Sequence, residues 1–261
     1  VGLLDSSGND MLPEKTRILE LKNAEQTFTF ENIPAKPTPS ILRGFSAPVK
    51  MTSDLTDDDL LFLMGHDSDG FNRWDAGQTY LQRLILGFCA GKTKAIPSAC
   101  YDAFGTLIND KKPDRALIAK ALTLPSEAYL AQLMDVVDVD GLHGARRFIY
   151  EEIGKRFYQD VTLLYGANAD QGPYSLLPAA VGKRRLRSIA LRYIQAANGA
   201  EALKLAGAQY ASATNMTDKV SALAVITDSA SPEKQAAFVD FYTAWKNDPL
   251  VLDKWFSLQA I

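Results

Sequence analysis

The chain has 261 residues, of which 47% are hydrophobic and 23% charged, and its formal net charge is −3. This is the composition of an ordinary globular protein of about two domains, and it argues against the basic face that nucleic-acid binding requires. No run of about 18 apolar residues predicts a membrane span. The two cysteines, Cys89 and Cys100, are too few for a disulfide framework, so we expect buried free thiols and a cytoplasmic location.

The first fifty residues carry the signals of short strands and turns. Residues 33–39 hold three prolines, which favour an extended edge or linker over a helix. Apolar or alternating runs, separated by turn-forming residues, lie at 1–4, 16–21, 27–30 and 40–50. The last of these fits a final strand followed by a hinge. Strands this few do not close a sandwich, so we predict a partial, immunoglobulin-like β-sandwich.

From about residue 55 the apolar residues recur with the period of a helix. Thr56 is placed to cap the first helix, and Asp57–Asp59 lie at the positive end of its dipole. Further helices are predicted at 72–88, 98–109, 114–123, 126–137, 142–165, 179–197, 200–213, 217–227, 232–247 and 250–261. About ten helices joined by short breaks indicate stacked antiparallel pairs of a helical-repeat superhelix.

The predicted fold is therefore mainly α-helical, with two parts. We assign residues 1–52 to the partial β-sandwich and its linker, and 53–261 to an α-α superhelical domain. The final helix ends on the apolar face of 255–261, whereas a solenoid normally closes with a polar face. We accordingly expect a truncated helical domain, with exposed apolar surface where each part is cut.

The sequence offers no set of residues that would perform catalysis or hold a metal. His66 and His143 are its only histidines, and neither has a second histidine three to five residues away or a nearby cysteine pair. The zinc-peptidase motif His-Glu-x-x-His is absent. We predict structural roles for both histidines, no catalytic or metal-ligating residue, and no cofactor in this chain.

Three further patterns have simpler explanations than a binding site. Gly87–Thr93 is one residue short of a phosphate-binding loop and follows a helix, so we expect a glycine C-cap with Lys92 near the helix end. The basic run Lys183–Arg187 suits the charged outer face of a helix better than a phosphate site. Thr217, within a glycosylation sequon, is expected to cap a helix.

Four segments, in register with one another, resemble bacterial aminopeptidase N. Residues 39–50, Pro-Ser-Ile-Leu-Arg-Gly-Phe-Ser-Ala-Pro-Val-Lys, resemble the segment that leaves the small β-sandwich domain of that family. Residues 61–76, which include Gly-Phe-Asn-Arg-Trp-Asp-Ala, are similar to the opening of its C-terminal helical domain. Residues 215–218 and 250–256 match the same domain in order. The resemblance covers nearly the whole chain and is looser between about 97 and 172.

The resemblance implies that this chain is a noncatalytic, C-terminal part of a cytoplasmic zinc aminopeptidase, which removes N-terminal residues from peptides. In the family, zinc and the general base belong to His-Glu-x-x-His plus a downstream Glu, and Gly-Ala-Met-Glu-Asn holds the substrate amine. All of these lie in an upstream catalytic domain, so no catalytic or metal residue is carried over to this sequence. The sandwich bridges the catalytic and helical domains, and the helical domain caps the active-site chamber.

Within that supporting role, Arg43 and Phe45 are our candidates for an interdomain hinge contact, because an arginine and an aromatic residue beside a proline-rich linker make good anchors. A role in local packing is an equal alternative for both residues. The alternative for the whole chain is a free-standing helical-repeat scaffold that binds a protein partner. The reading frame upstream of Val1 distinguishes the two, since only the first hypothesis requires His-Glu-x-x-His there.

Overall fold

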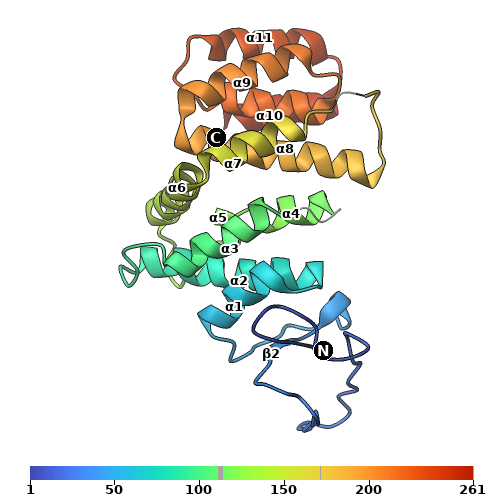
Figure 1. The fold of residues 1–261 in the computed structure, drawn as a ribbon. Helices are drawn as coiled ribbons and strands as arrows, with labels where there is room; N and C mark the ends of the chain where they lie inside the picture. Colours follow the sequence, from blue (N-terminus) through green and yellow to red (C-terminus); the bar gives the residue numbers. More distant parts are fainter. Residues whose placement is uncertain (111–113, 171, 261) are drawn as a thin grey trace. The chain divides into compact units, whose positions relative to one another are not determined.

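The structure is a computed structural model that describes residues 1–110, 114–170 and 172–260. Two short strands and a 3₁₀ helix precede a series of α-helices (Figure 1). The elements are β1 (Gly2–Leu4), β2 (Thr38–Ser40), η1 (Arg43–Phe45), α1 (Asp57–His66), α2 (Gly70–Cys89), α3 (Ser98–Ile108), α4 (Arg115–Ala121), α5 (Glu127–Ala131), α6 (Val139–Arg156), α7 (Tyr158–Ala167), α8 (Pro178–Ala197), α9 (Gly199–Ser212), α10 (Met216–Thr227), α11 (Glu233–Trp245) and α12 (Pro249–Gln259). The fold is thus mainly α-helical, as predicted.

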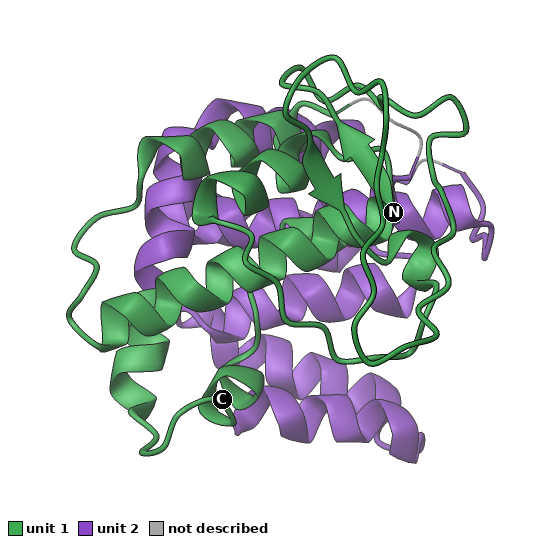
Figure 2. Cartoon of the chain, turned by 90° about the horizontal axis from the view of Figure 1, so that it is seen from below, with its two compact units in different colours: residues 1–110, 120–146 green, residues 111–119, 147–261 purple. Residues whose placement is uncertain are grey.

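The chain forms two compact units, coloured separately in Figure 2. The first comprises residues 1–110 and 120–146, and the second comprises 111–119 and 147–261 apart from the residues that the structure does not describe. Among the described residues, no helix is both long and apolar enough to cross a membrane.

The first unit begins with a two-stranded antiparallel sheet, in which β1 pairs with β2 and Gly2 lies opposite Ser40. The strands predicted at 16–21 and 27–30 are wrong, because residues 16–30, all of them described, form no strand. The residue pattern of these segments suits a strand, but no neighbouring strand pairs with them. Ile18 and Leu21 are 85% and 69% exposed, and a strand is stable only when a neighbour pairs with its backbone and covers one face. The strand expected at 40–50 ends at Ser40, where the chain turns into η1.

The helices of the first unit start with α1, whose N-terminus forms the predicted cap. The Thr56 hydroxyl accepts a hydrogen bond from the Asp59 amide, and the Asp59 carboxylate accepts one from the Thr56 amide, which makes a reciprocal capping box. Helix α2 packs closely on α1, because Gly77 leaves room for the Met64 side chain. A β-carbon at position 77 would lie 3.2 Å from Met64 Cγ.

The C-terminus of α2 confirms the helix cap predicted for Gly87–Thr93. Gly91 has φ +66°, the left-handed conformation in which glycine avoids a steric penalty. The Lys92 amide donates to the Gly87 carbonyl at 2.9 Å and the Gly91 amide to the Phe88 carbonyl at 3.0 Å, the pattern of a Schellman motif. Of the two cysteines, both free thiols, Cys100 is buried as expected and Cys89 only partly.

Two predicted helices differ in the structure. The helix expected at 126–137 ends as α5 at Ala131, because the amides of residues 132–134 donate to carbonyls three residues earlier instead of four. Asp138 then caps α6, since its carboxylate accepts a hydrogen bond from the Gly141 amide at 2.8 Å. The helix expected at 142–165 is two helices, α6 and α7. They are separated by Phe157, whose φ of −112° and ψ of 27° are not helical.

The second unit is a stack of helices in which each packs against its neighbours in sequence, from α7 through α12 (Figure 1). Its buried side chains include Leu186, Ile189, Ile194 and Phe241. Asn215, not Thr217, caps α10, since the Asn215 side chain accepts a hydrogen bond from the Asp218 amide at 2.9 Å. Helix α12 begins at Pro249 behind the Asp248 cap, as the Asp-Pro pair predicts.

Replacing Thr56 by alanine tests the first helix cap. The variant loses the hydroxyl that accepts from the Asp59 amide, and we expect a loss of about 1 kcal/mol in the free energy of unfolding, measured in urea by circular dichroism. Thr16→Ala is the control, because Thr16 is exposed and caps no helix. Equal stability of the two variants would contradict the assigned cap.

Candidate interdomain junction

A buried arginine connects the strand segment to the first two helices within the first unit. Arg43 lies in η1, three residues after the end of β2, and is only 5% exposed. A guanidinium carries five N–H donors and stays charged at any ordinary pH. Its burial therefore requires several acceptors and a compensating negative charge.

Four acceptors from separate parts of the chain surround the Arg43 guanidinium. Nη1 donates to Asp10 Oδ1 at 2.6 Å and to the Lys15 carbonyl at 2.9 Å. Nη2 donates to Asp67 Oδ1 at 2.7 Å, and Nε donates to Ser40 Oγ at 2.8 Å. Asp10 and Lys15 belong to the loop after β1, Ser40 ends β2, and Asp67 follows α1. One side chain thus joins three segments that are distant in sequence.

Ser40 and Asn72 extend this network into α2. The Ser40 hydroxyl donates to Asp67 Oδ2 at 2.5 Å and accepts from Asn72 Nδ2 at 2.7 Å. Asn72 Nδ2 also donates to the Ile41 carbonyl at 2.7 Å. Because each buried polar group has a hydrogen-bonding partner, the network fixes one relative placement of β2 and the α1–α2 turn.

Burial and the neighbouring polar groups act in opposite directions on the Asp67 carboxyl. Burial raises the pKa of the Asp67 carboxyl, while the Ser40 hydroxyl, the Asp69 amide and the Arg43 guanidinium oppose that rise. The Asp69 amide donates to Asp67 Oδ1 at 2.9 Å. Without Arg43, Asp67 would be a buried carboxyl group lacking its counter-ion, which is unfavourable in a protein interior.

Gly2 makes room for the arginine. A β-carbon built at position 2 would lie 2.1 Å from Arg43 Cζ and 2.4 Å from Nε. Any larger residue at position 2 would therefore displace the guanidinium from its acceptors. The position of the Arg43 side chain therefore requires glycine at position 2.

Phe45, the second candidate, lies at the surface rather than in the network. It is 53% exposed, and its ring packs on Phe71 of α2 with 5.1 Å between centroids. The backbone around it is unusual, since Leu42, Gly44 and Phe45 all have positive φ. The Gly44 amide donates to Asp69 Oδ2 at 2.8 Å, which holds the turn against the start of α2. Left-handed conformations at non-glycine residues persist only where surrounding contacts hold them.

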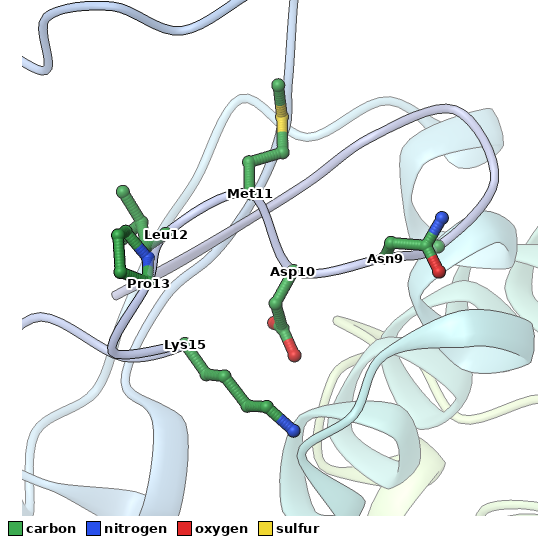
Figure 3. A pocket seen from close by; sticks show the side chains of 7 residues that line it. Asn9, Asp10, Met11, Leu12, Pro13 and Lys15 are labelled. Carbon is green, nitrogen blue, oxygen red and sulfur yellow. The ribbon is translucent and has the colours of Figure 1, made fainter.

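A shallow hollow lies beside Asp10, lined by Gly8–Pro13 and Lys15 (Figure 3). In this view the Asp10 side chain points downward and the Lys15 side chain runs toward the lower right. The Asp10 carboxylate accepts from Arg43 and, at 2.8 Å, from the Ser68 hydroxyl. Since both of its oxygens already have partners, this hollow serves the junction and offers no vacant carboxylate for a ligand.

The two histidines belong to different helices, and both lie in the first unit. His66 ends α1, with its ring 5.0 Å from that of Phe62, and His143 lies in α6 with Nδ1 3.3 Å from Glu127 Oε1. Throughout the described residues, no group of three or more His, Cys, Asp or Glu side chains is arranged to hold a metal ion.

The basic run Lys183–Arg187 differs from its prediction. Arg185 is exposed, but Arg184 is buried: it donates to Asp170 Oδ2 at 3.2 Å and to the Ser175 carbonyl at 2.7 Å. Arg187 lies 4.7 Å above the centre of the Tyr165 ring. The outer-face interpretation is therefore wrong for these two arginines. They are three residues apart on one helical face, and acidic and aromatic partners distant in sequence accommodate their charge.

Two family models match successive parts of the chain. Residues 1–54 match a domain of unknown function with an Ig-like fold (DUF3458), and residues 57–261 match a domain of unknown function with ARM repeats (DUF3458_C). The chain belongs to this DUF3458_C family. An Ig-like segment followed by a helical-repeat domain is the fold class that the sequence predicts.

Curated relatives carry the name aminopeptidase N. The chain is 36% identical to aminopeptidase N of Caulobacter vibrioides, in a match that covers all of this chain and 30% of the relative. It is 34% identical to aminopeptidase N of Escherichia coli, in a match that covers 93% of this chain and 28% of the relative. Aminopeptidase N of Haemophilus influenzae is 31% identical over the whole chain. The predicted resemblance is confirmed, and the chain spans about 30% of the length of these relatives.

A solved structure shares the fold. The crystal structure of Legionella pneumophila aminopeptidase A in complex with aspartic acid superposes with a TM-score of 0.87 at 31% sequence identity. The similarity covers 99% of this chain and 31% of that one.

The sequence indicated Arg43 but not the other side chains of the network, which are Asp10, Ser40, Asp67 and Asn72. A signal was present, since a buried arginine needs carboxylate partners, and Asp67 and Asp10 each lie in a turn next to an apolar run. Sequence separations of 24 to 33 residues hide that pairing without coordinates.

Replacing Arg43 by alanine should strongly destabilise the first unit. The change leaves Asp67 and Asp10 without their buried counter-ion, and we expect a loss of about 3–5 kcal/mol in unfolding free energy. Arg83→Ala is the matched control: Arg83 pairs with Asp57 at the surface, and its removal should cost about 1 kcal/mol or less. Urea unfolding measures both, and comparable losses would contradict a special role for Arg43.

Replacing Gly2 by alanine tests the steric coupling. The added methyl group would overlap the guanidinium, so we expect a loss of about 1–3 kcal/mol, measured by the same unfolding experiment. Gly144→Ala in α6 is the control, because a β-carbon there meets nothing within 4 Å and a helical alanine should stabilise slightly. An unchanged free energy of unfolding for Gly2→Ala would show that the Arg43 side chain can adopt another conformation at no cost.

Proposed function

We propose that this chain is a noncatalytic part of a cytoplasmic zinc aminopeptidase that removes N-terminal residues from peptides. Its role is to bridge to the catalytic domain and to cap the chamber in which peptides are cut. The observation that supports this most is the similarity to aminopeptidases N along the entire chain, at 31–36% identity. A curved array of helical repeats suits the wall of such a chamber.

The zinc ion and the catalytic groups are assigned to an upstream catalytic domain of the same polypeptide. The described side chains do not fit a zinc site, since no three of their His, Cys, Asp or Glu residues are arranged to hold a metal ion, and a catalytic zinc needs about three protein ligands. No step of peptide hydrolysis is therefore assigned to a residue of this chain.

Within the bridge, Arg43 and Phe45 have complementary parts. Arg43 is the fixed joint, because its buried hydrogen bonds tie the sandwich part, residues 1–52, to the first helices of the helical part, 53–261. Phe45 is the contact toward the catalytic domain, because this residue is 53% exposed on a turn that the Gly44–Asp69 hydrogen bond holds against α2. Exposed aromatic side chains on rigid turns are favourable anchors for an interface.

The decisive experiment uses the longer polypeptide encoded by the gene. We expect it to contain His-Glu-x-x-His upstream of Val1 and to hydrolyse alanine p-nitroanilide with loss of activity on zinc chelation. The 261-residue chain alone should not hydrolyse this substrate, with or without added zinc. Metal-dependent turnover by the chain alone, or a longer reading frame without the zinc motif, would refute the proposal.

In the active longer polypeptide, Phe45→Ala examines the bridge itself. Loss of an aromatic anchor should lower kcat/KM for a peptide by about tenfold while circular dichroism stays unchanged. Val49→Ala, which shortens another exposed apolar side chain of the same linker, is the control. If both variants keep full activity, Phe45 has only a local packing role.

A further inference from the structure

A groove of about 460 Å³ in the first unit lies beside the junction but shares none of its charged groups. Its walls are mainly apolar and come from three places: the linker after β2, helices α1 and α2, and the turn after α5. Representative apolar lining residues are Leu42, Val49, Met51, Leu60, Phe71 and Leu133. This size and this lining are typical of a site for a small organic ligand.

A polar stripe from α2 runs along the groove. Asp75, Thr79 and Gln82 all line it, and their spacing of four and three residues places them on one face of the helix. They contribute a carboxylate, a hydroxyl and a side-chain amide. Tyr129, on the α5 side, donates its hydroxyl to Gln82 Oε1 at 3.3 Å, so the stripe and the opposite wall are in contact at one end.

Asp75 differs from the other carboxylates near it. Asp10 and Asp67 pair with Arg43, and Asp69 accepts from the Asn72 and Gly44 amides. Asp75 has no hydrogen bond or ion pair with any described residue, although it is half-buried. Burial raises the pKa of its carboxyl, with no opposing hydrogen bond. A partly desolvated carboxylate of this kind gains most from an external cation.

The other charged groups of the groove do not meet that need. Arg83 donates to Asp57 Oδ1 at 2.8 Å and to the Leu55 carbonyl at 3.1 Å, so its charge is already matched. Lys50 lines the groove from the exposed linker and forms no ion pair with a described residue. Among the described lining residues, Asp75 is the one carboxylate, and it shares the groove with the apolar side chains of the linker and of α1.

We propose that this groove binds a small organic ammonium compound, namely a primary amine attached to an apolar side chain, as in an amino-acid amide or the free N-terminus of a short peptide. The ammonium group donates to the Asp75 carboxylate and the Thr79 hydroxyl, and the apolar substituent packs on the linker and on Leu133. The existence of this site does not depend on the proposed peptidase function.

The test is a titration of the ¹⁵N-labelled chain with leucine amide at a pH of about 6.5, where an α-amino group remains protonated. We expect shifts of the amide resonances of Asp75, Thr79 and Leu133, with a dissociation constant on the order of millimolar. N-acetyl-leucine amide has the same side chain without the ammonium and should cause no such shifts. Asp75→Asn should weaken leucine amide binding at least about tenfold.

Two variants keep the test decisive. Asp58→Asn removes an exposed carboxylate outside the groove and should bind normally. Leu133→Trp should abolish binding by filling the groove without touching the carboxylate, which covers the case of an Asp75 variant that does not fold. The proposal fails if leucine amide produces no shifts, if the acetylated compound binds equally, or if Asp75→Asn binds like the parent.

The longer polypeptide provides the last arm of the experiment. Calorimetry should detect leucine amide binding that is lost in the Asp75→Asn variant of that polypeptide. If binding occurs in the 261-residue chain and is absent from the longer protein, another part of the polypeptide covers the groove, and the small-ligand proposal is wrong. Peptidase activity is measured separately, so each proposal can fail without the other.

Discussion

The structure of the first unit depends on how one positive charge is kept out of water. Arg43 is stable in the interior only because Asp10, Asp67 and Ser40 converge on it, and each of those acceptors comes from a different segment. Removing any partner would leave a buried charge or donor unmatched, which costs more than the hydrogen bond contributes. These hydrogen bonds consequently hold the sandwich segment and the α1–α2 turn together.

The helices and their ends were largely readable from the sequence, because those signals are local. Thr56 with Asp59, Gly91 after α2 and Pro249 after Asp248 all act within a few residues of their own position. The strands at 16–21 and 27–30 were not, since pairing depends on a neighbour that an alternating pattern does not specify. The break at Phe157 also escaped, because its residues continue the helical period on both sides.

The junction was predictable only in part, and charge explains why. Arg43 was identified from its place beside the linker, whereas its two carboxylate partners lie 24 and 33 residues away and look like ordinary turn residues. For the same reason the sequence placed Arg184 and Arg187 at the surface. In the structure, Arg184 donates to Asp170 and Arg187 lies over the Tyr165 ring, both within the second unit. A run of basic residues in a sequence locates the cations, but only the fold shows which of them have acidic or aromatic partners.

Asp67 also has a consequence for how the molecule is made. Its amide closes the last turn of α1, and its carboxylate orients the Asp69 amide just before α2, so this one residue shapes the connection between the two helices. Synthesis proceeds from the N-terminus, so the ribosome releases Arg43 before Asp67. Until the α1–α2 turn emerges, the nascent sandwich segment carries a cation that lacks one of its two carboxylate partners. The strand segment and the first helical pair should therefore acquire their native arrangement together.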